Sequence, residues 1–338
     1  MQAFMIITSL LSTARSFRPL ACTFRSSRMS MSSEASSTLV GKTCLTVKEA
    51  IAAHGNVKFL DGSWYLKGRN SRQEFEDGPR IEGADYFDID DTASTGDDLN
   101  PKNLPHMMPP PKLFAAAMDA MGITNDDTIV IYGNKECFFT HRAWFQIRGM
   151  GHTKLHLMEG DLSEWIDLNG PIENDKRTTV WAKDLDLSSE TKYRAAGPEN
   201  VVDMERMLEI IKEGESSDSV IVDVRSKERF LGQVEEPRPN MRLGHMPGAL
   251  NLPFTDLLDP ENLTKFKSIQ ELNKIIQEAG IDIDSSKKIV ASCGSGATAC
   301  TLVLALDLCG RDPGSTFVYD GSWSEWGGEN STPIVKDE

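Results

Sequence analysis

The sequence contains no long apolar run and comparatively little positive charge. No stretch of its 338 residues approaches the ~20 consecutive apolar residues of a membrane-spanning helix, so no membrane partner is expected. Only 36 lysines and arginines stand against 51 acidic residues, which gives a formal net charge of −15. Nucleic acid and anionic lipid both repel a chain of this sign, so neither is expected as a partner.

Cysteine is also scarce, and the six cysteines form no Cys-x-x-Cys pair and no cluster with metal-ligand spacing. One of them, Cys22, falls in an N-terminal segment that looks like a targeting sequence. The other five belong to a chain whose targeting looks intracellular. We therefore expect free thiols, no disulfide framework, no bound metal and no cofactor.

The first 33 residues differ in composition from the rest of the chain. They contain four arginines and many serines but no acidic residue, which is typical of an organelle transit peptide. We assign residues 1–38 to this disordered presequence and expect mitochondrial import, with a plastid as the second choice. Translation from Met29 or Met31 would instead give a cytoplasmic form.

The remainder repeats itself with an offset of about 160 residues, a length typical of one domain. The clearest pair is Glu159–Trp165, which returns as Asp320–Trp326. Three shorter pairs follow the same order: Phe59–Asp61 with Ile221–Asp223, Ile81–Ala84 with Met246–Ala249, and Thr128–Val130 with Lys288–Val290. Because the pairs occur in the same order, the sequence predicts two tandem copies of the same fold.

Each copy alternates short apolar runs with segments of helical spacing, which predicts an α/β fold. We expect two tandem domains, each a largely parallel sheet flanked by helices. The domains should cover residues 39–172 and 204–338, with a polar linker over 173–203. In the second copy the expected strands are Val220–Val222, Ala249–Leu252, Ile289–Ala291 and Phe317–Tyr319, and the expected helices are Ile269–Ala279 and Thr298–Cys309.

The segment Cys293–Cys300 carries the clearest chemical signal. It follows an apolar strand, opens on a cysteine, continues with small residues and leads into a helix. Backbone N–H groups of a tight loop at a helix N-terminus favour an anion, so the Cys293 thiol should ionise more easily than an ordinary cysteine. We therefore predict that Cys293 is a nucleophile.

The first copy does not reproduce this loop. The repeat offset aligns Cys293 with Gly133, and the nearest cysteine, Cys137, lies in a bulky stretch that cannot form a small-residue cradle. We expect an inactive first domain and a catalytic second domain. The remaining cysteines should be structural, with Cys300 and Cys309 packed against the sheet.

Four segments together resemble the tandem rhodanese-domain sulfurtransferases, and among them those that act on 3-mercaptopyruvate. The resemblance covers nearly everything from Leu45 to Val335. The segments are Leu60–Leu66, Gly244–Ala249, Cys293–Cys300 and Tyr319–Trp326.

The resemblance implies that the Cys293 thiolate takes the sulfur of 3-mercaptopyruvate, forming a persulfide and releasing pyruvate. A small thiol, cyanide or reduced thioredoxin would then accept the sulfur. The persulfide is an anion and needs the same N–H cradle as the thiolate. That cradle comes from Gly294, Ser295, Gly296, Ala297 and Thr298.

Further site residues follow from the same resemblance. Arg229 and Arg238 would bind the substrate carboxylate, for which a guanidinium offers paired donors. The alternative is that both arginines pair with neighbouring glutamates on the surface. Ser295, Asp90 and His106 would relay a proton as the pyruvate enolate leaves. The acidic stretch between Asp90 and His106 looks longer than usual, which leaves their geometry open. His245, which precedes a strand, is interpreted as structural.

Two other enzyme classes and one non-enzymatic function compete with this hypothesis. Thiosulfate sulfurtransferases place basic residues directly after the cysteine, whereas this chain has the neutral Gly294 and Ser295. A rhodanese-like phosphatase needs an arginine six positions after the cysteine, and Ala299 stands there. A sulfur carrier with two inactive copies would not need the intact Cys293 loop.

Overall fold

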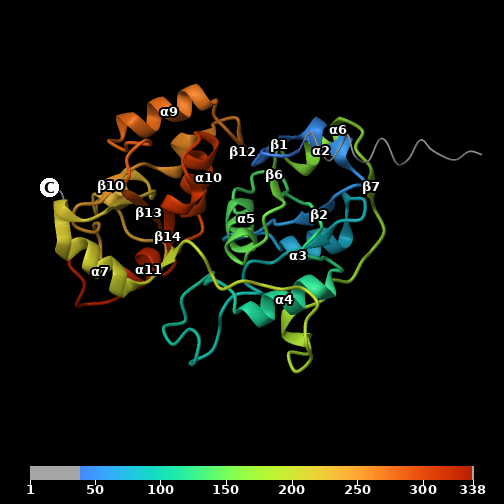
Figure 1. Ribbon diagram of the computed structural model, residues 1–338, viewed down its shortest axis with the longest axis horizontal. Coiled ribbons are helices and arrows are strands. Elements are labelled where there is room, and N and C mark those ends of the chain that lie inside the picture. Colours follow the sequence, from blue (N-terminus) through green and yellow to red (C-terminus); the bar gives the residue numbers. More distant parts are fainter. Residues whose placement is uncertain (1–38, 337–338) are drawn as a thin grey trace, which may run out of the picture.

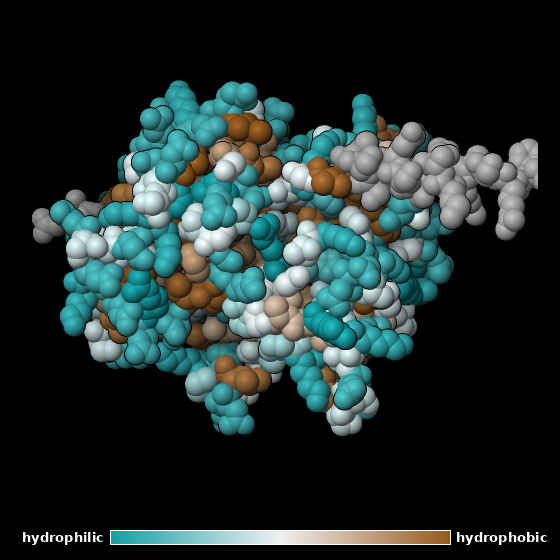
Figure 2. Space-filling view, viewed as in Figure 1, coloured by the Kyte–Doolittle hydropathy of each residue, from teal (hydrophilic) through white to brown (hydrophobic). Residues whose placement is uncertain are grey.

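The computed structural model describes residues 39–336, and the predicted transit peptide lies outside them. The described chain forms two lobes that meet along helices α5 (Thr140–Gly149) and α10 (Ala299–Leu308), which face each other at the centre of Figure 1. The surface seen in Figure 2 is largely hydrophilic, with apolar residues in scattered patches. No helix within residues 39–336 is long and apolar enough to cross a membrane.

The first lobe is built on a five-stranded sheet with the order β1-β6-β5-β2-β4, in which all neighbours are parallel. A two-stranded antiparallel ribbon, β3 with β7, lies beside it. The elements of the first lobe, in chain order, are β1 (Cys44–Thr46), α2 (Val47–Ala53), β2 (Lys58–Asp61), α3 (Ser71–Asp77), β3 (Arg80–Ile81), β4 (Asp85–Tyr86), α4 (Pro111–Ala120), β5 (Ile129–Tyr132), α5, β6 (Leu155–Glu159), α6 (Leu162–Asp167) and β7 (Ile172–Glu173).

The second lobe repeats this sheet with the order β8-β14-β13-β9-β10, again all parallel. Strands β11 and β12 pair as an antiparallel ribbon. The elements of the second lobe are β8 (Val201–Val202), α7 (Met204–Glu213), η2 (Gly214–Ser216), β9 (Ser219–Asp223), α8 (Lys227–Phe230), β10 (Leu250–Asn251), η3 (Phe254–Leu257), β11 (Leu258–Asp259), β12 (Asn262–Phe266), α9 (Ile269–Glu278), β13 (Lys288–Ser292), α10, η4 (Pro313–Ser315), β14 (Thr316–Tyr319) and α11 (Ser322–Trp326).

The predicted fold class is confirmed, and the elements expected in the second copy all form within one or two residues of their predicted bounds. Local sequence explains several of the helix ends. Ser268 and Glu271 form a capping box at the start of α9, which satisfies N–H groups that a helix start leaves unpaired. Gly310 follows α10 with a φ of 86°, a left-handed conformation that glycine adopts without steric cost.

The segment predicted as a linker lies against the first lobe before it enters the second. It contains the short helix η1 (Ala182–Asp184), whose Ala182 N–H donates to the Asp91 carboxylate at 2.8 Å, and Arg177 pairs with Asp85. Its last residues form β8, so the second sheet takes its edge strand from within the segment 173–203. The exact domain boundaries stay a prediction.

The two lobes share one hydrophobic core. One face of the first sheet packs against α4 and α5, one face of the second packs against α9 and α10, and the buried residues of both faces form a single cluster. The outer faces have separate cores, under α2, α3 and α6 in the first lobe and under α7 and α11 in the second. Burial at about 25 cal/mol per Å² of apolar surface therefore holds the lobes to each other as well as within themselves.

Candidate active site

Cys293 follows directly after strand β13, and its residue surface is only 2% exposed. The neighbouring carbonyl groups are held by the start of α11. The Cys293 carbonyl accepts from Trp323 N–H at 3.0 Å and the Gly294 carbonyl from Ser324 N–H at 2.8 Å. The Cys293 N–H in turn donates to the Ser322 hydroxyl at 3.1 Å. These bonds hold the start of the loop in place and engage the carbonyl groups of Cys293 and Gly294.

The five N–H groups from Gly294 to Thr298 donate to no other atom within the described residues. Their donor capacity is thus available to a group bound on Cys293, as an anion-binding loop requires. Gly296 has a φ of 78°, and a Cβ on it would lie 2.8 Å from the Asp320 carbonyl oxygen. Only glycine fits there, so the small-residue composition of the loop has a steric reason.

Arg229 and Arg238 both reach the loop at Gly294. A Cβ placed on Gly294 would lie 3.0 Å from Arg229 Nη2 and 3.9 Å from Arg238 Nη1. The two guanidinium groups, which come from α8 and from the irregular segment after it, therefore converge beside the residue that follows Cys293. The resemblance assigned this pair to the substrate carboxylate, and that role stays a prediction.

The two arginines are held differently. Arg229 bonds the buried carboxylate of Glu236 through Nη2 at 2.5 Å, and Glu236 is itself held by Arg225 at 2.8 Å. Arg238 forms no hydrogen bond or ion pair with any residue from 39 to 336, since the Glu236 carboxylate is taken up by the other two arginines. Burial lowers the pKa of Arg238 and Arg229 adds to that shift, whereas the nearby Cys293 and Asp90 oppose it. Arg238 is thus a half-buried cation with free donors.

His106 and Asp90 form a pair despite the long acidic stretch between them. His106 Nδ1 lies 2.5 Å from Asp90 Oδ1, and the imidazole is 3% exposed. His106 Nε2 is buried without a partner among the described residues, and the indole of Trp64 packs edge-on at 4.6 Å. Ser295 is 7% exposed, and its hydroxyl makes no hydrogen bond to His106. The structure therefore brings together the Asp90–His106 half of the predicted relay.

Two residues around the site, Arg142 and Asp320, were not expected from the sequence. Arg142 on α5 donates through Nη2 to the Asp320 carboxylate at 2.6 Å and to the His106 carbonyl. Glu236 is one of the neighbouring glutamates that the alternative named, and it pairs with Arg229 but not with Arg238. The repeated segment Asp320–Trp326 pointed to Asp320, but the sequence analysis used it only as a repeat. Nothing in the sequence signals that Arg142, 178 positions earlier, is its partner.

The other cysteines do not share this environment. All five cysteines of the described residues are free, and burial raises the pKa of Cys137 to about 11 and that of Cys300 to about 12. Burial also raises the pKa of Cys44 well above its ordinary value. Cys300 and Cys309 pack on the shared core as expected. His245 bonds the Phe230 carbonyl at 2.9 Å and stacks on that ring, which agrees with its structural interpretation.

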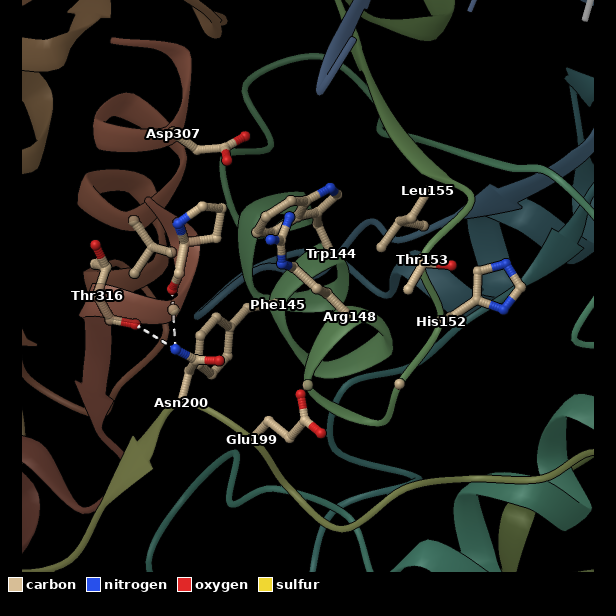
Figure 3. A pocket seen from close by; sticks show the side chains of 15 residues that line it. Trp144, Phe145, Arg148, His152, Thr153, Leu155, Glu199, Asn200, Asp307 and Thr316 are labelled. Atoms are coloured by element: carbon tan, nitrogen blue, oxygen red, sulfur yellow. Dashed lines mark hydrogen bonds between the residues drawn. The ribbon is translucent and has the colours of Figure 1, made fainter. Parts of the chain in front are cut away.

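Away from the Cys293 loop, a cavity of about 290 Å³ lies between the lobes at the C-terminal end of α5 (Figure 3). The Arg148 side chain lies over the Trp144 indole there, with Glu199 and Asp307 at the edges. None of the predicted site residues lines it. No group of three or more potential metal ligands occurs in residues 39–336.

Comparison with known proteins adds family information to this geometry. The model of the rhodanese-like domain matches residues 204–329. The 3-mercaptopyruvate sulfurtransferase of Rattus norvegicus is 36% identical over 277 residues, which covers 80% of this chain and 84% of that protein. The Escherichia coli protein of the same name is 36% identical over 79% of this chain and 86% of its own.

Solved structures agree with these relatives. The Tum1 protein from Saccharomyces cerevisiae matches with a TM-score of 0.73 and 27% identity, covering 88% of this chain and 98% of its own. SseA from Escherichia coli, titled a 3-mercaptopyruvate sulfotransferase of rhodanese fold, matches with a TM-score of 0.67 and 29% identity over 83% of this chain and 99% of its own. The chain therefore belongs to the 3-mercaptopyruvate sulfurtransferase family and is a sulfurtransferase built on two rhodanese-like domains.

Proposed function

We propose that this enzyme transfers the sulfur of 3-mercaptopyruvate through a persulfide on Cys293. The observation that carries the proposal is the convergence of Arg229 and Arg238 on Gly294, next to a cysteine whose loop N–H groups are unpaired. A substrate with a carboxylate and a transferable sulfur satisfies both features at once. The guanidinium groups would hold the carboxylate, and the loop would hold the sulfur.

The first half-reaction follows from this placement. The Cys293 thiolate attacks the sulfur of the substrate, so a sulfur–sulfur bond forms while the carbon–sulfur bond breaks. The electron pair of the broken bond stays on carbon as the enolate of pyruvate, which then takes up a proton. The persulfide anion remains in the loop, where the N–H groups from Gly294 to Thr298 stabilise its charge.

The proton for the enolate would come from the Ser295, His106 and Asp90 relay. Asp90 holds His106 through Nδ1, which leaves the buried Nε2 as the imidazole atom that can exchange a proton with substrate or with Ser295. A buried nitrogen without a partner costs free energy in the resting protein, so a function at that atom explains its retention. The relay thus combines a first-domain pair with a second-domain hydroxyl.

In the second half-reaction a nucleophile takes the outer sulfur and restores the Cys293 thiolate. Cyanide would leave as thiocyanate, and a small thiol or reduced thioredoxin would leave as its own persulfide. Each acceptor forms one sulfur bond as the Cys293 sulfur–sulfur bond breaks, so no further oxidant or reductant is needed.

Thiosulfate is the alternative donor. A relative from Arabidopsis thaliana, 33% identical over 83% of this chain and 82% of its own length, is named a thiosulfate/3-mercaptopyruvate sulfurtransferase. Thiosulfate is a dianion and would gain from cations directly after the cysteine, where this chain has Gly294 and Ser295. The uncharged Gly294 and Ser295 therefore favour 3-mercaptopyruvate, which carries a single carboxylate, over thiosulfate.

A direct assay tests the proposal. The purified chain is incubated with 3-mercaptopyruvate and cyanide, and pyruvate and thiocyanate are both measured, with thiosulfate and cyanide in a parallel reaction. Pyruvate and thiocyanate should form in equal amounts, and the specificity constant should be higher for 3-mercaptopyruvate. The absence of pyruvate, with thiocyanate formed from thiosulfate, would reverse the assignment. The absence of turnover with either donor would indicate a sulfur carrier instead.

The cellular location is a separate proposal, namely import into mitochondria. It is supported by the arginine- and serine-rich composition of residues 1–33 and by a similar Arabidopsis thaliana protein named as mitochondrial, 33% identical over 82% of this chain and 74% of its own. Fusing residues 1–38 to a fluorescent protein should direct it to mitochondria. Fluorescence in plastids, or in the cytoplasm for the full chain, would select one of the alternatives.

A further inference from the structure

The backbone of His106 has a left-handed conformation, with a φ of 59°. Residues other than glycine adopt this conformation uncommonly, even though histidine does so more often than most. Such a conformation persists only when the surroundings impose it. The imidazole points to Asp90 because of this turn, so whatever holds the backbone of His106 also sets the direction of its ring.

Two buried charges hold this backbone from both sides. Arg142 donates to the carbonyl oxygen of His106, and the Asp320 carboxylate accepts from the N–H of Met108 at 2.8 Å. Arg142 and Asp320 bond each other at 2.6 Å, with side chains 0% and 6% exposed. The pair crosses the domain seam, since Arg142 lies on α5 of the first lobe and Asp320 follows β14 of the second.

The same pair also touches the sulfur-binding loop. A Cβ on Gly296 would lie 3.4 Å from Arg142 Nη1 and 2.8 Å from the Asp320 carbonyl oxygen. Arg142 Nη1 and Nε are buried and have no other partner among the described residues. One ion pair therefore bonds the segment that carries His106, and its arginine lies beside Gly296 of the loop that carries Cys293.

We infer that the Arg142–Asp320 ion pair is a positioning device that fixes His106 relative to the Cys293 loop. This inference rests on the proposed function, because it assigns the pair an effect on the His106 relay. Neither residue touches the substrate in this arrangement. Their effect is to hold the His106–Met108 segment in its left-handed turn, with Nδ1 on Asp90 and Nε2 left as the ring atom without a partner.

The inference predicts a specific kinetic signature. Loss of the pair should lower kcat for pyruvate formation at least tenfold, since general acid–base catalysis contributes 10²–10⁴-fold. The KM should change less than about threefold, because Arg229 and Arg238 are untouched. Sulfur transfer from the preformed persulfide to cyanide should also be spared, because that step has no enolate to protonate.

The main variant is Arg142→Met combined with Asp320→Asn. Removing only Arg142 would leave the buried Asp320 carboxylate without its partner, which destabilises the fold strongly. The double variant removes both charges and keeps an amide oxygen that can accept from Met108. Circular dichroism and thermal unfolding establish that it folds. Lys102→Met is the matched control, because Lys102 also bonds across the seam, to Glu325 at 2.9 Å, without touching His106.

A double-mutant cycle with His106→Ala separates positioning from general support. If the pair acts through His106, adding Arg142→Met and Asp320→Asn to His106→Ala should lower kcat by less than about twofold more. The inference would be overturned if the losses in kcat from His106→Ala and from the Arg142→Met, Asp320→Asn variant were fully additive. It would also be overturned if the kcat of the latter variant stayed within twofold of the parent. Lys102→Met should retain full activity, and a loss there equal to that of the paired variant would also overturn it. If the parent itself forms no pyruvate, the proposed function fails instead.

Discussion

The two domains use the same backbone at the end of the same strand but differ in what they place there. Tyr132 pairs with Asp61 in the first sheet as Ser292 pairs with Asp223 in the second, so Gly133 and Cys293 occupy equivalent positions. The carbonyl of each accepts a hydrogen bond at 3.0 Å from the start of the helix that comes after the next strand, α6 or α11. The fold thus supplies the position, and the side chains decide whether it is a reactive site.

In the first domain, neighbouring side chains occupy the space around Gly133. A Cβ on Gly133 would lie 2.7 Å from the Thr140 methyl group and 3.4 Å from the Cys137 Cβ, so a nucleophile has no room. Arg142, which follows on the same helix α5, points instead to the second domain. The first domain has no reactive thiol at this position, but it contributes charged and titratable groups to its partner's site.

The neighbouring strand ends show the same contrast in charge. Asp223 in the second domain is neutralised by Arg225 at 2.6 Å, and Arg225 continues through Glu236 to Arg229. The matching Asp61 has Ser63 where the second domain has Arg225, and burial raises the pKa of Asp61 to about 6. Only the second domain therefore has an arginine here, and through Glu236 this arginine connects Asp223 to Arg229, one of the two proposed substrate-binding cations.

The largest expected effect comes from removing the thiol of the second domain. Cys293→Ser should abolish sulfur transfer and leave the fold intact, because a serine hydroxyl supplies almost no anion near neutral pH. Mass spectrometry after addition of 3-mercaptopyruvate should locate one added sulfur atom on the Cys293 peptide of the parent protein. An added sulfur on Cys137 would break the comparison, since the first domain would then be active.

The next largest effect concerns the two cations. Arg229→Ala or Arg238→Ala should raise the KM for 3-mercaptopyruvate, because a charged hydrogen bond is worth about 1.5–3 kcal/mol, or roughly tenfold to a hundredfold. Arg→Lys should restore part of the loss. Transfer from the preformed persulfide to cyanide is the internal control. If both half-reactions are damaged equally, the arginines are structural.

A smaller effect is expected from charging the loop itself. Replacing Gly294 by Arg and Ser295 by Lys should raise the ratio of thiosulfate to 3-mercaptopyruvate specificity constants severalfold, because a dianion gains more from added cations. A side chain at position 294 would also press on Arg229 Nη2 and so disturb the carboxylate site proposed for Arg229 and Arg238. An unchanged ratio would show that charge after the cysteine does not set the donor preference.

The last prediction concerns stability rather than activity and separates the two structural carboxylates, Asp61 and Asp223, by pH. The raised pKa of Asp61 means that the folded state holds its proton more tightly than the unfolded state, so its stabilising contribution is present below about pH 4 and is lost as pH rises through about 6. At 1.36 kcal/mol per pKa unit the loss is about 3 kcal/mol. Asp61→Asn should therefore raise the free energy of unfolding above pH 6 relative to the parent.

Asp223→Asn is the matched control for that measurement. It should destabilise the protein at neutral pH, because it leaves the buried Arg225 with only Glu236, a carboxylate that it shares with Arg229. The free energy of unfolding from urea denaturation at pH 4, 6 and 8 compares the two variants. If Asp61→Asn follows the same pH dependence as the parent, Asp61 does not titrate in this range.

Much of this arrangement could be predicted from the sequence because it is local or repeated. The Cys293 loop is continuous, and the repeat offset aligns it correctly with Gly133. Interactions between distant residues could not be predicted in this way. Arg142 looks like any helical arginine, and only the packing of α5 against α10 shows that it meets Asp320. The free state of Arg238 depends on Glu236 binding Arg229 and Arg225, which the cluster of glutamates around it does not reveal.

The shared core between α5 and α10 has a consequence for the order in which this protein is made. Domains generally fold as units from the N-terminus during synthesis. That order would place the helix that carries Arg142 and the segment that carries His106 ahead of Cys293 during synthesis. The second domain would then fold against apolar side chains that the first domain already presents, since both contribute to one core.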